Sequence, residues 1–231
     1  MIRPIVREIV RPPDLIREGY DSFADQILNG EGGDGLQPPG DWSKPELLNY
    51  LCDFRGFVAH GSNFGDFESL VPVPNPNRDI SEFGSRDYVL ASPDALWAMW
   101  FAVLDRKVLH HGTANDCRPV ERNGTAVAKS YWFAVDERDL KDGSRPLTNG
   151  FMYLLKGYDF SHHNAQEWGS AEPVKPLTVI PVTPMDFPFA DAILGYDAEL
   201  LMRLIDNDRD GMPWFHDQSL WPVRPDAYLA E

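Results

Sequence analysis

The sequence predicts an α+β protein with a core of antiparallel strands and helices at the N- and C-termini. Helical periodicity marks the first ~50 of its 231 residues and returns near residue 198. Between these regions lie short apolar runs of strand length, separated by polar, Pro-rich connections. Strands joined by irregular segments, with helices toward the ends, favour α+β over a doubly wound parallel sheet.

The N-terminal region is expected to hold two helices. Residues 13–28 carry apolar side chains at three-and-four spacing, which predicts a helix with one apolar face. Residues 29–40 are rich in Gly and Pro and form a loop; they lack the GxxxxGK[ST] pattern of a phosphate loop. Ser43 and Glu46 match a capping box that opens a second helix through Leu51.

The middle and C-terminal regions are expected to hold strands and two more helices. Ser92 as N-cap and Pro93 as first helical residue predict a helix over 94–104, which is apolar nearly all round and therefore buried. A last helix over 198–205 precedes a tail rich in Trp and Pro. Strands are expected at 55–60, 88–91, 130–135, 151–155 and 177–182. We expect one domain built from an N-terminal helical segment (1–53), a strand-rich core (54–185) and a C-terminal segment (186–231).

Composition excludes several classes of function. The net charge of −15 repels phosphate backbones and anionic membranes, so nucleic acid and membrane are not the expected partners. No apolar run approaches the ~20 residues that cross a bilayer, and the first residues lack the apolar region of a secretory signal. Cys52 and Cys117 match neither a disulfide framework nor a metal motif, which predicts reduced thiols and a cytoplasmic location.

Two segments resemble a known family. Phe57-Val-Ala-His60-Gly61-Ser62-Asn63 ends a predicted strand, and Tyr88-Val-Leu-Ala91 leads to Trp100 nine residues after Ala91, with Phe83-Gly84 upstream. This order resembles the ADP-ribosyltransferase superfamily, which includes diphtheria-type toxins, poly-ADP-ribose polymerases and RNA 2′-phosphotransferases. The resemblance covers roughly residues 55–182 and implies a split antiparallel sheet that binds NAD.

The resemblance implies a role for each motif residue. His60 would bond a ribose hydroxyl, Gly61 would pair with the nicotinamide carboxamide, and Ser62 would hold the ribose or the carboxamide. Tyr88 and Trp100 would line the nicotinamide pocket, because aromatic faces stack on a flat ring.

The catalytic pair implied by the resemblance is His60 and Glu167, with Glu172 as the rival carboxylate. A carboxylate near the ribose stabilises the positive charge of an oxocarbenium-like transition state. The expected enzyme cleaves the nicotinamide–ribose bond and transfers ADP-ribose to an acceptor. The acidic surface favours a protein or small molecule over nucleic acid as that acceptor.

Other interpretations remain open. The same fold can act as a non-catalytic module that binds a nucleotide or a protein, with His-Gly-Ser as a plain strand-end turn. Asp206, Asp208, Asp210 and Asp217 match a calcium loop, although Pro213 and the short Asp217 favour an ordinary acidic turn. The pairs His110-His111 and His162-His163 fit water-facing loops better than metal sites, since adjacent strand residues point to opposite faces.

Overall fold

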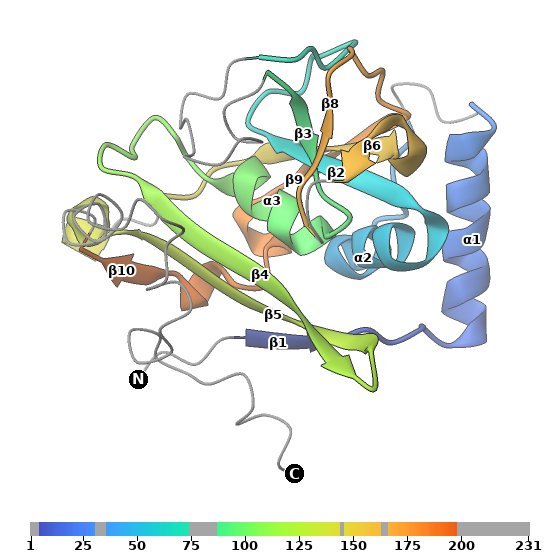
Figure 1. The fold of residues 1–231 in the computed structure, drawn as a ribbon, viewed down its shortest axis with the longest axis horizontal. Helices are drawn as coiled ribbons and strands as arrows, with labels where there is room; N and C mark the ends of the chain where they lie inside the picture. Colours follow the sequence, from blue (N-terminus) through green and yellow to red (C-terminus); the bar gives the residue numbers. More distant parts are fainter. Residues whose placement is uncertain (1–4, 31–35, 74–86, 144–145, 163–165, 198–231) are drawn as a thin grey trace. The chain divides into compact units, whose positions relative to one another are not determined.

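The computed structural model describes residues 5–30, 36–73, 87–143, 146–162 and 166–197 (Figure 1). Helices and antiparallel sheets are both present, which confirms the α+β class. The chain divides into two compact units, and we describe each by itself. The hairpin unit comprises residues 1–9, 106–146 and 191–231, and the sandwich unit comprises residues 10–105 and 147–190. These limits do not coincide with the segments 1–53, 54–185 and 186–231 expected from the sequence.

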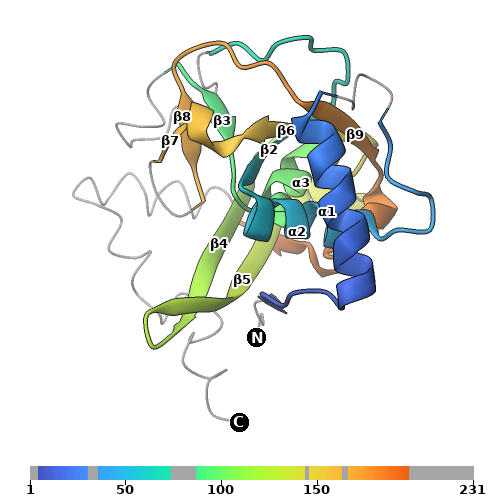
Figure 2. The ribbon, with the colours of Figure 1, turned by 90° about the vertical axis from the view of Figure 1, so that its right-hand side faces the viewer.

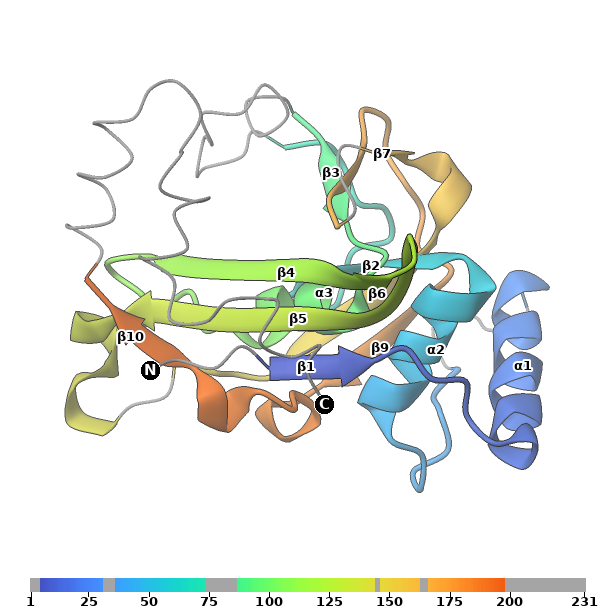
Figure 3. The ribbon, with the colours of Figure 1, turned by 60° about the horizontal axis from the view of Figure 1, so that its bottom comes forward.

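The hairpin unit is built around one long strand, β5 (Thr125–Asp136). β4 (Thr113–Arg122) runs antiparallel along one edge of β5, and the Asn123-Gly124 turn joins the two strands with φ of 53° and 74°. Asn and Gly are the residues that tolerate this left-handed turn. β1 (Ile5–Glu8) pairs antiparallel with one half of the other edge, and β10 (Leu194–Tyr196) pairs parallel with the other half (Figure 3). The 3₁₀ helix η1 (Glu137–Gly143) follows β5.

The sandwich unit contains three helices and two three-stranded antiparallel sheets (Figure 2). The helices are α1 (Asp14–Leu28), α2 (Lys44–Arg55) and α3 (Ala95–Val103). One sheet has the order β2 (Phe57–Ser62), β6 (Gly150–Lys156) and β9 (Thr178–Val182). The other has the order β3 (Val89–Ala91), β8 (Trp168–Ser170) and β7 (Ser161–His162). The short 3₁₀ helices are η2 (Gly157–Asp159) and η3 (Pro184–Asp186), and η4 (Ala190–Ala192) lies at the limit of the unit.

Helix α3 lies directly on one face of the first sheet. A Cβ added at Gly61 would stand 2.0 Å from the carbonyl oxygen of Ala98, and one at Gly150 would stand 1.8 Å from that of Ala102. Only glycine permits such a close approach of backbone to backbone. The opposite face of the sheet packs into a second core that joins it to β3 and β8, formed by Val58, Leu70, Val89, Ala91, Tyr153, Leu155, Phe160 and Val174.

The helix termini differ from expectation in two places. α2 begins after Ser43 as predicted, but the Ser43 side chain makes no capping hydrogen bond, and the helix continues past Leu51 to Arg55. The N-cap of α3 is Asp94 and not Ser92; its carboxylate accepts the Trp97 N–H at 2.8 Å. Ser92 is instead occupied in a backbone bridge to Ala59.

The apolar face predicted for α1 is correct in its middle and wrong at its start. Tyr20, Phe23 and Ile27 are buried, whereas Leu15 is 84% exposed. Within the described residues, no helix combines the length and apolar character needed to cross a membrane.

We expect Gly150→Ala to destabilise the sandwich unit, because the new methyl group would collide with the backbone of α3. Overpacking of this kind costs about 1–3 kcal/mol or more. Urea unfolding followed by circular dichroism measures the loss. Gly40→Ala is the matched control, since a Cβ at Gly40 meets no atom within 4 Å. Equal stability of the two variants would contradict the close approach.

Candidate functional site

His60 lies on β2 beside the place where the two sheets of the sandwich unit meet. Among the described residues, the two sheets are bridged at Ala59 and Ser92, whose backbones exchange hydrogen bonds of 2.8 and 2.9 Å. One residue further along β2, Nδ1 of His60 lies 2.7 Å from the carbonyl oxygen of Leu90 on β3. A carbonyl only accepts, so Nδ1 carries the proton and Nε2 is the acceptor nitrogen of the neutral ring.

The Gly61 backbone points toward β3. In an antiparallel ladder, the N–H and C=O groups of alternate residues face the same neighbour. Since the Ala59 backbone bonds Ser92 and not β6, the N–H and C=O of Gly61 face the same way. Among the described residues, the pairing of β2 with β3 does not extend to Gly61 and Leu90, because the bridge of Ala59 with Ser92 is isolated. Gly61 is buried, and buried backbone groups in proteins are almost always paired.

Ser62 and Asn63 have roles in the fold. The Ser62 hydroxyl accepts the Phe64 N–H at 3.1 Å and so shapes the turn after β2. The Asn63 side-chain amide donates to the Ala102 carbonyl at 2.7 Å, which satisfies a carbonyl in the last turn of α3. The sequence assigned Ser62 to the ribose or the carboxamide, and the structure places it at this turn instead.

Trp100 does not lie beside His60, which corrects the role expected for it. Ala98 and Ala102 are the α3 residues that contact Gly61, and Trp100 lies on the far side of the helix, fully buried. Its ring packs against Phe187, with 5.9 Å between ring centroids. The side chain of His60 leaves the opposite face of the sheet from α3, so the imidazole and the indole are separated by β2 itself.

Two other aromatic side chains of α3 are partly exposed. Trp97 and Phe101 are half-buried and lie edge to face, with 5.4 Å between ring centroids. They precede and follow Ala98 on the helix, near the point of contact with Gly61. Their spacing of four residues is visible in the sequence, but the face of α3 that meets the sheet is not.

Tyr88 and Glu167 flank the paired strands β3 and β8. Tyr88 is half-buried and forms a bridge with Val73 just before β3, and Glu167 is half-buried directly before β8. Trp168 pairs with Ala91 and packs on the second core, so strand alternation directs Glu167 to the opposite face. By the same alternation, Leu90 and Ser92 belong to the face of Glu167. The pairing of Ser92 with Ala59 puts Ala59 on this face, and Gly61, two residues further along β2, lies on it too.

The rival carboxylate, Glu172, lies beyond the other end of β8. It is exposed, and its backbone N–H donates to the Ser170 hydroxyl at 3.2 Å. Glu167 lies near the Ala59–Ser92 bridge, and Glu172 lies at the far end of β8. The order of the strands therefore favours Glu167 over Glu172 as the candidate carboxylate near Gly61.

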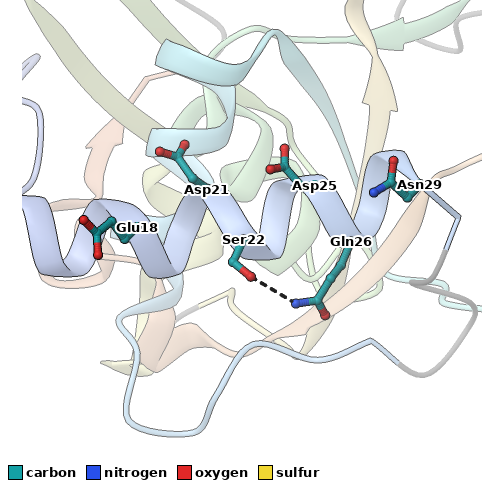
Figure 4. A pocket seen from close by; sticks show the side chains of 6 residues that line it. All are labelled: Glu18, Asp21, Ser22, Asp25, Gln26 and Asn29. Carbon is teal, nitrogen blue, oxygen red and sulfur yellow. Dashed lines mark hydrogen bonds between the residues drawn. The ribbon is translucent and has the colours of Figure 1, made fainter.

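A hollow on the surface of the sandwich unit lies elsewhere. It follows the exposed face of α1 and is lined by Glu18, Asp21, Ser22, Asp25, Gln26 and Asn29 (Figure 4). Asp21 accepts a hydrogen bond of 2.6 Å from Tyr50, and Asp21 and Asp25 both pair with Arg55. The hydrogen bonds from Tyr50 and Arg55 lower the pKa of Asp21 against the effect of its burial. These contacts tie α1 to α2.

Several sequence-based candidates lie outside the described residues: Phe83, Gly84, His163, Asp206, Asp208, Asp210 and Asp217. Among the described residues, no group of three or more His, Cys, Asp or Glu side chains is arranged to hold a metal ion.

His110 and His111 are exposed and lie in a loop, as expected from the sequence, and both are hydrogen-bonded to a buried carboxylate of the hairpin unit. Nδ1 of His111 lies 2.8 Å from the Asp139 carboxylate, which also accepts the backbone N–H groups of His110 and His111 at 3.1–3.3 Å. The Asp139 side chain is only 2% exposed. Although burial raises the pKa of Asp139, these hydrogen bonds outweigh it and leave the pKa below its usual value.

We expect Asp139→Asn to cost about 2 kcal/mol of stability at neutral pH, because hydrogen bonds to a charged acceptor are lost. A lowered pKa in the folded state stabilises the protein above the ordinary pKa of 3.8, and this gain disappears as the pH falls through the folded value. Urea unfolding at about pH 7 and pH 3 measures the effect. Glu121→Gln, on the exposed part of β4, is the control. A loss at pH 3 as large as at pH 7 would contradict the role of the ionised carboxylate.

Comparisons with protein-family models, with curated proteins and with solved structures find no match to this chain.

Proposed function

We propose that the sandwich unit binds NAD where β2 and β3 part, and that it cleaves the nicotinamide–ribose bond to transfer ADP-ribose to an acceptor. The observation that carries the proposal is the orientation of Gly61: its N–H and C=O face β3, and among the described residues the β2–β3 pairing does not extend to it. A primary carboxamide has one donor and one acceptor edge, and a backbone N–H and C=O side by side complement it.

The resemblance of the His60-Gly61-Ser62 segment to the ADP-ribosyltransferase superfamily supports the same site. In this arrangement the Gly61 backbone holds the carboxamide, and Nε2 of His60 accepts a ribose hydroxyl. The bond from Nδ1 of His60 to Leu90 fixes the ring that would do this. Tyr88 and the half-buried aromatics Trp97 and Phe101 are the candidates to line the nicotinamide ring, in place of the buried Trp100.

Glu167 is the carboxylate that we assign to the reaction. It lies on the same face as Gly61, with β3 between their strands and an offset of two residues along them, so their backbones are roughly 12 Å apart. A bound nicotinamide riboside spans this range, which would put the ribose carbon near the carboxylate. As the bond to nicotinamide breaks, positive charge grows on the ribose, and an ionised glutamate stabilises it.

One observation favours a second candidate, a module that binds a nucleotide without cleaving it. His60 and Glu167 leave the sheet on opposite faces, so they meet the same ligand only if it passes through the opening between β2 and β3. A ligand that stays on the Gly61 face would touch Glu167 and not the imidazole.

We expect NAD to raise the melting temperature by several degrees at about 100-fold over its Kd, because a ligand that binds only the native state stabilises it. His60→Ala should reduce this shift, whatever its effect on the melting temperature without ligand. Gln26→Ala, on the exposed face of α1, should leave the shift unchanged. The absence of any NAD-dependent shift in the unaltered protein would refute the proposed site.

We expect slow release of nicotinamide from NAD, measured by chromatography, and a loss of about 100-fold or more in Glu167→Gln. The NAD thermal shift should survive in this variant, since only charge is removed. Glu172→Gln should retain the activity. If Glu172→Gln loses activity and Glu167→Gln keeps it, the carboxylate is assigned wrongly; if NAD binds and no nicotinamide appears, the non-catalytic module is correct.

A further inference from the structure

The turn after β2 exposes two phenylalanine rings side by side. Phe64 is 61% exposed and Phe67 is 40% exposed, with 6.2 Å between ring centroids and 58° between ring planes. Single exposed apolar residues are ordinary on protein surfaces, whereas adjacent large ones mark contact sites. These rings belong to residues 64–68, which we call the aromatic loop.

The aromatic loop is fixed to the sheet. The buried Tyr153 hydroxyl donates to the Phe64 carbonyl at 2.7 Å, and the Phe67 N–H approaches the same hydroxyl at 3.4 Å. Gly65 sits so close to the Phe151 ring that a Cβ would be 2.4 Å from it. A surface held in one shape before binding loses little entropy when a partner docks.

Two acidic residues belong to the aromatic loop, one between the two phenylalanines in the sequence and one directly after them. Asp66 and Glu68 are both exposed, and within the described part of the chain neither forms an ion pair. Burial, together with the negative charge of Asp66, raises the pKa of Tyr153. With two exposed rings and two exposed carboxylates, the aromatic loop presents ring faces and negative charge together.

We propose that the aromatic loop is a docking site for an arginine-bearing segment of a partner protein. A guanidinium stacks on an aromatic face and donates in parallel to a carboxylate, and both partners are present here. Aromatic rings also stack on nucleobases, but Asp66 and Glu68 would repel the phosphates. The net charge of −15 acts in the same direction and steers basic partners toward the protein.

The aromatic loop lies close to His60 through a chain of rings. His60 contacts Tyr153 at 6.0 Å between centroids, and Tyr153 contacts Phe67 at 5.9 Å. A docked arginine-bearing segment would therefore lie beside the proposed NAD site. The docking site does not depend on the proposed function. The statement that the docked partner is the acceptor of ADP-ribose rests on the proposed function.

Isothermal titration calorimetry of the full chain, without NAD, tests the docking. The probe is an unstructured peptide of alternating Gly and Arg, compared with the same peptide carrying citrulline, which keeps the shape and removes the charge. We expect binding of the arginine peptide that weakens as salt is raised, and no binding of the citrulline peptide. Equal binding of both peptides would overturn the proposal, as would binding of a single-stranded oligonucleotide in their place.

Variants locate the docking. Phe64→Leu keeps the apolar volume and removes the ring face, so affinity for the arginine peptide should fall about two- to fivefold. The double variant Asp66→Asn with Glu68→Gln should weaken binding about two- to tenfold and reduce the salt dependence. Tyr158→Leu and Asp41→Asn, an exposed aromatic and an exposed acid outside the aromatic loop, are the matched controls. Losses as large in the controls as in the variants would place the docking elsewhere.

The outcome is independent of the NAD experiments. Arginine-peptide binding in a protein that shows no NAD shift would support the docking site and refute the enzyme. An NAD shift and nicotinamide release in a protein that ignores the arginine peptide would refute the docking site and leave the enzyme intact.

Discussion

The sandwich unit depends on the contact of α3 with the backbones of β2 and β6. Gly61 and Gly150 permit it, because any side chain at either position would collide with the helix. The contact sets the rotation of α3, which directs Trp100 away from the sheet and into the core with Phe187. It also brings the Ala102 carbonyl within reach of Asn63. Gly61 and Asn63 thus have a structural reason to be present before any ligand is considered. His60 and Ser62 also have one, since the first bonds the Leu90 carbonyl and the second shapes the turn after β2.

The sequence predicts elements where burial imposes a pattern. The strands β2, β6 and β9 each contain a short apolar run because helix and second core cover both faces, and their predicted positions agree with the structure within two residues. β4 was not predicted, since it is a half-exposed edge strand that contains Asp116, Pro119 and Glu121. Its long pairing with β5 joins residues of two strands, and no pattern within β4 reveals it.

The candidate site was predictable only in part, because local patterns in the sequence do not show which distant residues pack together. Strand-end position and the His-Gly-Ser order are properties of the sequence, and they identify His60 and Gly61. Which face of α3 meets the sheet depends on packing, so the nine-residue spacing from Ala91 to Trp100 could not show that Trp100 lies away from His60. The pairing of His60 with Leu90, and of Phe67 with Tyr153, joins residues far apart in the chain, and no local pattern reveals such contacts.

A glycine at position 61 is therefore weak evidence for a ligand, because packing against α3 already requires it. The orientation of its backbone is stronger evidence. Continued pairing of β2 with β3 would satisfy the N–H and C=O of Gly61 with Leu90, and the register set by Ala59 and Ser92 aligns these residues for it. Instead, the His60 side chain takes the Leu90 carbonyl, and the ladder stops after a single bridge. The backbone groups of Gly61 that face β3 are the ones that the proposed carboxamide would bond.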